Sequence, residues 1–277
     1  MKKLGLLVIF TLLGISPAVA GSSSSPSASP KGMAMVMPTA PPLTGSPAKM
    51  GGTLLDAPIP SAVLAIPLQD ATGKTFTLSS LKGRSIILTD FFTSCDMICP
   101  MTTANMRNIG DAITRAGLSK KFVVLELSVD AQRDTVARIR AYQNLFGQAK
   151  PSWTVATGSV PGLKTFWAFF GVYAKNVPKA DGESVDWQTG KRLAYDVEHA
   201  NVVVLIDAKG HFRWLDLGNP AVKDATEVPA KLKLFLSDQG RLNLMHPQQW
   251  DWEPSAVYGA INQVLNLQIG SSMKMGK

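Results

Sequence analysis

Apolar residues along this chain follow two patterns: short continuous runs, and longer stretches in which they recur about every 3.6 positions. The short runs predict buried strands and the longer stretches predict amphipathic helices. The predicted strands cover residues 85–92, 122–129, 153–158 and 202–206. The predicted helices cover residues 101–116, about 130–146, 160–170, 230–236 and 254–267.

Strands and helices alternate through the middle of the chain. Strands that are almost continuously apolar and separated by helices are typical of a parallel sheet with both faces covered, so we predict an α/β fold. Two β-hairpins flank this core, one within residues 64–78 and one that pairs 202–206 with 211–214. The polar stretch 176–194 is predicted as a surface insertion or hairpin, whereas the segment 240–253 has no predicted role.

The first twenty residues have the pattern of a secretory signal peptide. Lys2 and Lys3 precede an apolar run, and Ala18-Val19-Ala20 forms a small-residue cleavage site. An uncleaved membrane anchor is the alternative, because residues 4–20 are just long enough to span a bilayer. We expect no lipid anchor, because the residue immediately after the predicted cleavage site is Gly21 rather than a cysteine. We therefore expect an exported protein of the bacterial periplasm.

Residues 21–57 are rich in serine, proline and methionine and are predicted to form a disordered linker. The linker contains Met33, Met35 and Met37, whose thioether sulfurs suit Cu(I), although linker composition alone also explains them. The folded domain is predicted to span residues 58–269, and residues 270–277 are predicted to be a flexible tail.

The chain is moderately basic. Its formal net charge of +8 falls by two, to +6, when Lys2 and Lys3 are removed with the signal peptide. This excess favours contact with a membrane surface or an acidic partner. No basic run with interleaved aromatic residues is present, and the expected export also argues against nucleic-acid binding.

The only two cysteines, Cys95 and Cys99, lie four residues apart between a predicted strand and a predicted helix. A disulfide across so short a loop constrains little of the unfolded chain and would stabilise the fold weakly. The pair is therefore better suited to a chemical role than to a structural disulfide. Pro100 fits the first turn of the helix, whose amides and dipole favour the thiolate form of both cysteines. Such a pair can close a disulfide, exchange disulfides or bind a soft metal.

The strand followed by TSCDMICP resembles the Sco/SenC family of thioredoxin-like copper chaperones for cytochrome oxidase assembly. The segments Ser128–Thr135, Trp153–Gly158 and Phe170–Tyr173 are similar to the family at corresponding places. The resemblance implies a thioredoxin-like fold and a copper-binding histidine at His199, immediately before the strand 202–206. It implies delivery of copper to a respiratory oxidase copper-site subunit or another periplasmic cuproprotein, with a thiol-disulfide reductase as a further partner. Family members usually carry Asp before this histidine, and here the residue is Glu198.

Two thiolates and one imidazole make a ligand set suited to Cu(I), so Cys95, Cys99 and His199 are the candidate metal ligands. A structural zinc site needs a fourth strong ligand, such as Glu198 or Asp96, which makes zinc a poorer fit. Asp96 and Met97 are predicted to be exposed loop residues. The remaining candidates that we do not assign as ligands are His211 and His246, which lack partners at ligand spacing, and Asp130 and Asp134, which are predicted to anchor a helix N-terminus.

A thiol-disulfide oxidoreductase that reduces client cysteines for metallation is the alternative function, with Cys95 and Cys99 as the redox pair. A binding or sensing module without either activity is a third possibility. Nucleophilic hydrolysis has no support in the sequence, because the chain has no Gly-x-Ser-x-Gly, His-Glu-x-x-His or phosphate-binding glycine motif.

Overall fold

The computed structural model describes residues 51–147, 150–179, 185–222, 224–245 and 251–265. The chain divides into two units, Met1–Met37 and Pro38–Lys277, and all described residues belong to the second. The predicted signal peptide, Met33, Met35, Met37, His246 and the tail 270–277 lie outside the described residues.

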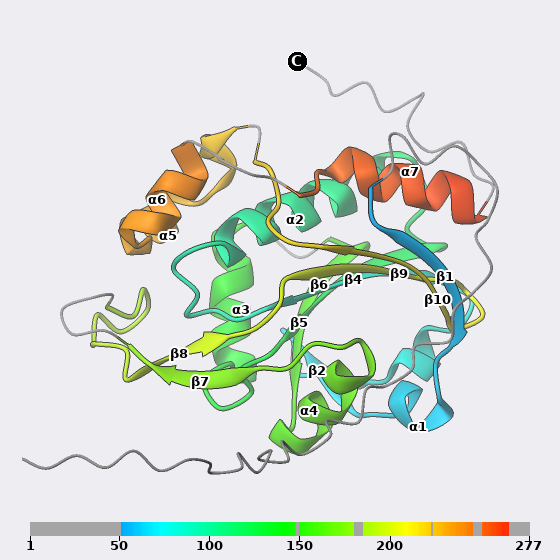
Figure 1. Cartoon of the computed structure of the whole chain (residues 1–277), viewed down its shortest axis with the longest axis horizontal. Helices are drawn as coiled ribbons and strands as arrows, with labels where there is room; N and C mark the ends of the chain where they lie inside the picture. Colours follow the sequence, from blue (N-terminus) through cyan, green and yellow to red (C-terminus); the bar gives the residue numbers. More distant parts are fainter. Residues whose placement is uncertain (1–50, 148–149, 180–184, 223, 246–250, 266–277) are drawn as a thin grey trace, which may run out of the picture. The chain divides into compact units, whose positions relative to one another are not determined.

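An eight-stranded sheet forms the centre of the domain (Figure 1). Its order is β1-β10-β9-β4-β5-β6-β2-β3. β4, β5 and β6 run parallel, as the continuous apolar runs predict, and the remaining neighbours pair antiparallel. The strands are β1 (Thr53–Pro58), β2 (Leu68–Asp70), β3 (Thr75–Phe76), β4 (Ser85–Phe91), β5 (Phe122–Ser128), β6 (Trp153–Gly158), β9 (Val202–Ile206) and β10 (His211–Leu217).

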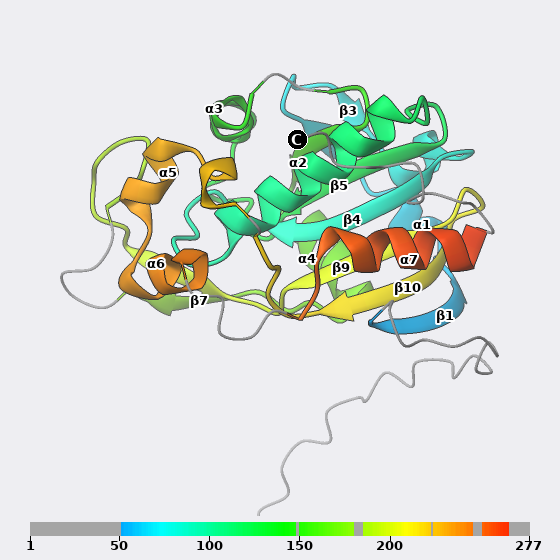
Figure 2. The ribbon, with the colours of Figure 1, turned by 90° about the horizontal axis from the view of Figure 1, so that it is seen from above.

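Helices cover both faces of this sheet (Figures 1 and 2). Alternate residues of each central strand pack into two different cores, as Ile87 and Leu88 of β4 do. The helices that contribute buried residues to the first core are α2 (Cys99–Arg115), α3 (Val136–Leu145), α5 (Ala230–Phe235), α6 (Asp238–Met245) and α7 (Pro254–Leu265). The helices of the second core are α1 (Ser61–Leu64) and α4 (Val160–Phe169).

The order β10-β9-β4-β5, with α2 between β4 and β5 and α7 after β10, is the thioredoxin-like arrangement. The predicted α/β, thioredoxin-like fold is therefore confirmed. The two predicted hairpins form as β2–β3 and β9–β10. Among the described residues, no helix is both long and apolar enough to cross a membrane.

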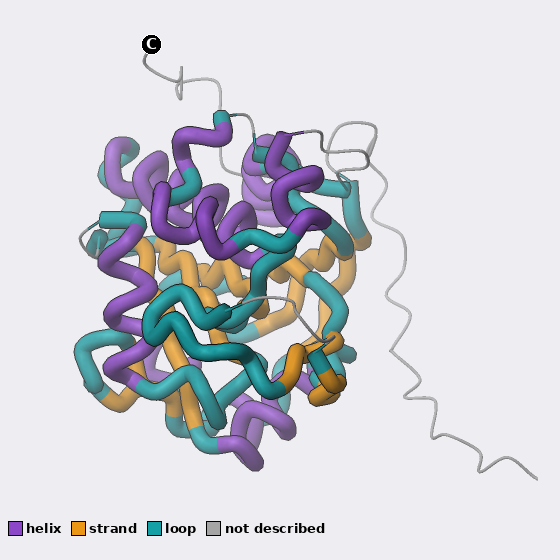
Figure 3. Tube along the Cα trace, turned by 90° about the vertical axis from the view of Figure 1, so that its left-hand side faces the viewer, coloured by secondary structure: helices purple, strands orange, loops and turns teal. Residues whose placement is uncertain are grey.

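One end of the sheet carries additional elements (Figures 1 and 3). A separate two-stranded sheet pairs β7 (Lys175–Pro178) with β8 (Tyr195–Glu198). The polar stretch 176–194 lies largely between these strands, so the predicted insertion is confirmed, but the hairpin extends beyond that stretch because β8 begins at Tyr195. The short helix α6 (Asp238–Met245) follows α5 at the same end. Two short 3-10 helices, Leu78–Leu81 and Ala225–Glu227, complete the described elements.

Several predicted boundaries were wrong. Strand β1 occupies the end of the predicted linker and pairs with β10, so the sheet begins before residue 58. Residues 61–64 are helical, and α3 begins six residues later than predicted. Helix α2 begins at Cys99 rather than at residue 101, so Cys99 is the first helical residue. Helix α6 occupies part of the segment 240–253.

Candidate metal and redox site

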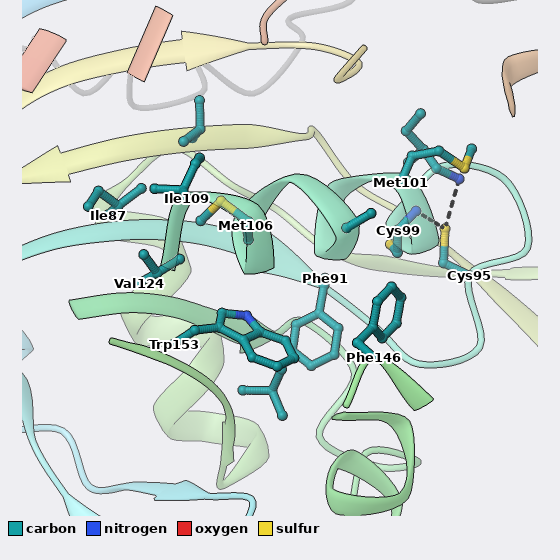
Figure 4. Close-up of a cluster of buried hydrophobic side chains, with 14 of the residues drawn as sticks. Ile87, Phe91, Cys95, Cys99, Met101, Met106, Ile109, Val124, Phe146 and Trp153 are labelled. Atoms are coloured by element: carbon teal, nitrogen blue, oxygen red, sulfur yellow. Dashed lines mark hydrogen bonds between the residues drawn. The ribbon is translucent and has the colours of Figure 1, made fainter. Parts of the chain in front are cut away.

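The cysteine loop, residues 92–98, joins the end of β4 to the start of α2. The Cys95 amide donates to the Phe92 carbonyl at 3.2 Å, which turns the chain back toward the helix. Pro100 occupies the first turn of α2, where a missing N–H costs no hydrogen bond. Both sulfurs are covered, with Cys95 5% and Cys99 1% exposed, and the two cysteines are not joined in a disulfide. Figure 4 shows the two side chains together at the start of the helix.

The Cys95 sulfur accepts hydrogen bonds from two backbone amides. The N–H groups of Ile98 and Cys99 donate to it at 3.5 and 3.3 Å, drawn as dashed lines in Figure 4. Burial raises the pKa of Cys95, but the Cys99 thiol and these amides outweigh it and lower the pKa to about 7. Cys95 is therefore partly thiolate at neutral pH, as the sequence predicts.

Cys99 differs from its partner. Burial raises its pKa well above the ordinary value, and the neighbouring Cys95 raises it further. The prediction that the helix start favours thiolate at both cysteines was wrong for Cys99, because one small loop stabilises a single negative charge. The pair therefore consists of one reactive sulfur and one protonated sulfur.

His199 lies between β8 and β9, at the end of the sheet where β4 terminates. Its Nδ1 contacts Oδ2 of Asp90 and lies 3.0 Å from the Ala200 carbonyl, and its ring packs edge-on against Phe92 with centroids 5.4 Å apart. Asp90 is the penultimate residue of β4, and its Oδ1 accepts from the Val202 amide at 2.8 Å. Burial lowers the pKa of His199, but Asp90 outweighs it and raises the pKa to about 9. Without a metal, the imidazole is protonated at neutral pH.

The buried side chain of Asp134 fixes the beginning of the cysteine loop by hydrogen bonds. The Thr93 hydroxyl donates to its Oδ1 at 2.5 Å and the Ser128 hydroxyl to its Oδ2 at 2.6 Å, while the Thr93 amide lies 3.2 Å from both oxygens. Arg138 donates from Nε to Thr93 Oγ1 at 2.5 Å. Burial raises the pKa of Asp134 to about 6. The prediction that Asp134 anchors a helix was wrong, because Thr135 caps α3.

Asp130 also differs from the prediction. Its side chain pairs with Arg133 and accepts from the Tyr195 hydroxyl at 3.0 Å. Arg133 in turn donates to the Tyr195 carbonyl at 2.8 Å. Asp130 therefore connects the end of β5 with the hairpin that leads to His199, rather than capping a helix.

Glu126 fixes helix α2 to the sheet. The Thr103 hydroxyl donates to Oε2 and the Trp153 indole N–H to Oε1, both at 2.7 Å. The side chain is fully buried, and this burial raises its pKa to about 7.

Asp96, between the two cysteines, is 1% exposed, so the prediction of an exposed loop residue was wrong. Its carboxylate forms an ion pair with Lys179 at 2.9 Å, and Lys179 also pairs with Asp196 at 2.9 Å. The neighbouring Met97 is 42% exposed, as predicted.

The other candidate ligands lie elsewhere. His211 Nδ1 contacts the Asp56 carboxylate at 2.7 Å, on the strand pair β10 and β1. Glu198 is exposed at the end of β8. Among the described residues, no group of three His, Cys, Asp or Glu side chains is already arranged to hold a metal ion. Both cysteines and His199 lie at the end of the sheet where β4 terminates. Their convergence on one ion stays a prediction.

Sequence reasoning assigned no role to Asp90, Lys179, Ser237 or Gly240, all of which contact this site. A signal existed for Asp90, since an acidic residue inside an apolar strand has to find a buried partner. The other three come from segments far along the chain, and no local pattern connects them with the cysteines.

The fold and the site together define a thioredoxin-like domain with a dithiol at the start of its first long helix and a carboxylate-bound histidine nearby. The SCO1/SenC family model matches residues 65–233, more than half of the chain. The chain belongs to the SCO1/SenC family, which confirms the resemblance.

Three similar proteins illustrate the relationship. The chain is 28% identical to the SCO1 protein homolog of Bacillus subtilis over 109 residues, which are 39% of this chain and 55% of that protein. It is 28% identical to the mitochondrial SCO2 homolog of Danio rerio over 176 residues, 63% of this chain and 57% of that protein. The crystal structure of Arabidopsis thaliana ScoI with copper bound matches with a TM-score of 0.44 and 28% sequence identity. The match covers 53% of this chain and 82% of the ScoI chain. The chain thus spans little more than half the length of these two curated relatives.

Proposed function

We propose that this protein binds one copper ion through Cys95, Cys99 and His199 and delivers it to the copper site of a respiratory oxidase subunit. Membership of the SCO1/SenC family supports the general role. The observation that carries the ligand assignment is the placement of two free cysteines, Cys95 on the loop and Cys99 at the first residue of α2, at the end of the sheet where His199 lies. Thiolate and imidazole donors suit Cu(I), and a low coordination number leaves room for transfer.

The contact between His199 and Asp90 fits a metal ligand. Histidine ligands commonly direct their second ring nitrogen to a carboxylate, which fixes the tautomer and the ring orientation. Here Asp90 occupies Nδ1, so Nε2 is the nitrogen assigned to copper. Binding requires loss of the imidazole proton and movement of the loop or the ring, because the described residues form no complete cage.

The proposal includes export. The pattern of residues 1–20 supports secretion to the periplasm, where a respiratory copper site or another cuproprotein is accessible. A comparison of the amino terminus of the secreted protein with that of the full chain tests cleavage after Ala20.

Copper stoichiometry tests the ligand set. Reduced protein and its Cys95→Ala, Cys99→Ala and His199→Ala variants are loaded with Cu(I) and desalted, and copper is counted per chain. We expect one copper per wild-type chain and a marked loss in each variant. His211→Ala is the matched control, because His211 contacts Asp56 on the strand pair β1–β10 and should leave the copper content unchanged. Unchanged binding in any two of the three ligand variants contradicts the assignment.

A second function, thiol-disulfide exchange, is favoured by the asymmetry of the two cysteines. The Cys95 thiolate attacks one sulfur of a client disulfide and releases a client thiolate, which forms a mixed disulfide. Cys99 then loses its proton and attacks Cys95, which frees the second client sulfur and leaves a Cys95–Cys99 disulfide. Two electrons pass to the client, and an external dithiol reductase restores the pair.

The two functions differ in their need for the imidazole. Reduction of a disulfide-bonded client peptide should persist in His199→Ala and disappear in Cys95→Ser, whereas copper binding should be markedly weakened in both. A dithiol that does not react with client disulfides excludes the redox function and leaves the copper proposal intact.

A further inference from the structure

Helix α6 holds the cysteine loop from the outside. The carbonyl oxygen of Asp96 accepts hydrogen bonds from the Ser237 amide at 3.0 Å and the Ser237 hydroxyl at 3.2 Å. The next carbonyl along the loop, that of Met97, accepts from Asn243 Nδ2 at 3.4 Å. Two consecutive peptide groups between the cysteines are therefore bonded to one short helical segment.

Gly240 permits this close approach. A Cβ atom at this position would lie 2.1 Å from the Asp96 carbonyl oxygen, so any larger side chain forces the helix or the loop to move. The Gly240 amide also donates to Ser237 Oγ at 3.1 Å. The Ser237 hydroxyl thus caps α6 and, at the same time, donates to the loop.

These contacts lie next to buried sulfurs. Cys95 is 5% and Cys99 1% exposed, so a metal ion or a thiol reagent reaches them only when the loop moves. The hydrogen bonds from α6 oppose that movement. Ser237, Gly240 and Asn243 all follow residue 233, where the match to the family model ends, so this support is made by a part of the chain beyond the matched segment.

We infer that Ser237 and Gly240 are positioning residues that hold the loop between Cys95 and Cys99 closed and thereby limit the rate at which reagents and copper reach the sulfurs. The part of this inference that concerns copper rests on the proposed function, whereas the part that concerns access to the thiols does not.

Thiol labelling of the reduced, metal-free full-length chain with N-ethylmaleimide at fixed pH tests the inference. Loss of the Ser237 hydroxyl removes one hydrogen bond to the loop, so Ser237→Ala should label about fivefold faster than the wild type. Gly240→Ala should label faster still, because the added methyl group displaces the loop. Ser237→Thr keeps a hydroxyl and should label close to the wild-type rate.

The chain supplies a matched control in helix α4. Ser159 caps this helix by accepting from the Gly162 amide at 3.2 Å, the same Ser-x-x-Gly arrangement, without a described contact to the cysteine loop. Ser159→Ala loses an equivalent cap and should label at the wild-type rate. A wild-type rate in Ser237→Ala, or an equal acceleration in Ser159→Ala, overturns the inference even if Gly240→Ala fails to fold.

A second readout separates this inference from the proposed function. Cu(I)-loaded protein is mixed with excess bathocuproine disulfonate, and the rate of copper loss is recorded. We expect Ser237→Ala to release copper about fivefold faster than Ser159→Ala. Faster labelling with unchanged copper loss supports the positioning role and refutes its link to copper, whereas failure of every chain to bind copper refutes the proposed function only.

Discussion

The inner and outer sides of the cysteine site are held by different kinds of contact. On the inner side, carboxylates inside the fold bind the loop, helix α2 and His199; these are Asp134, Glu126 and Asp90. On the outer side, Lys179 binds the Asp96 side chain and Ser237 binds the Asp96 carbonyl. The inner carboxylates are 0–2% exposed, whereas Ser237 is partly exposed.

This difference separates stability from access. An inner contact cannot be lost without leaving a polar group unpaired in the core, which is costly. The outer contacts of the partly exposed Ser237 and Asp196 can be lost while the sheet and both cores remain intact, because Asp96 keeps its ion pair with Lys179. We therefore expect inner variants to change the free energy of unfolding and outer variants to change mainly the rate of access to the sulfurs.

The largest effect is expected for Asp134→Ala. The substitution leaves the Thr93 amide and hydroxyl and the Ser128 hydroxyl without their acceptor and should lower the free energy of unfolding by about 3–5 kcal/mol. Chemical denaturation measures the loss. Asp56→Ala, at a carboxylate 52% exposed, is the control and should cost less than about 1 kcal/mol. An Asp134→Ala loss as small as the control contradicts the importance of the inner side.

Glu126 should make stability depend on pH. The pKa of its carboxyl is about 7 in the folded protein against an ordinary 4.5, so the unfolded chain releases this proton first as pH rises. Its contribution is fully present below pH 4.5 and is lost as pH rises through about 7, a change of about 3 kcal/mol.

Glu126→Gln isolates this contribution. The amide imitates the protonated carboxyl, accepting from Trp153 and donating to Thr103. The unfolding free energy of the variant, followed from about pH 4 to 8 by urea titration, should fall less steeply than that of the wild type. Parallel curves for the two proteins contradict the role assigned to burial.

Asp90→Asn should weaken copper binding by about 10–100-fold, because the carboxylate orients His199 and increases the basicity of the ring. The amide side chain of this variant retains an oxygen for the Val202 N–H, which keeps the strand contact. Competition with a Cu(I) chelator measures affinity, and Asp207→Asn, at a turn after β9, is the control. Equal affinities for the two variants show that the Asp90–His199 contact is structural only.

The smallest effect on stability is expected for Asp196→Asn. Asp196 is 20% exposed and Lys179 keeps its pair with the buried Asp96, so the loss should be about 1 kcal/mol. Cysteine labelling should nevertheless accelerate, because Lys179 is held less firmly against Asp96. Lys150→Met removes a weaker pair, at 3.9 Å from Asp111, and should change neither quantity. An effect of Asp196→Asn on stability alone contradicts the distinction between the two sides.

The apolar pattern was sufficient to predict the central strands, and the reason is physical. Val202–Ile206 and Phe122–Ser128 are fully buried on both faces, so nearly every residue has to be apolar. Strand β1 was missed because it lies at the sheet's edge, where its mixed burial resembles a linker. Helix α6 has only two buried residues, and so it lacks a clear periodic signal.

The sequence also singled out Cys95, Cys99 and His199 as candidate ligands, because spacing and a family motif are local properties, and their binding of copper stays a prediction. It did not predict that Asp96 would be buried, since the partner Lys179 lies 83 residues away in the chain. The difference in pKa between the two thiols could not be predicted from the sequence either, because it depends on which sulfur the amides of Ile98 and Cys99 reach.

X-ray absorption of the Cu(I)-loaded protein is the most direct test of the central claim. Two sulfur ligands and one nitrogen ligand are expected in the wild type. In the copper that His199→Ala still retains under excess Cu(I), the nitrogen contribution should disappear while both sulfurs remain. A copper shell that is identical in the wild type and in His199→Ala contradicts the claim that this imidazole binds the metal.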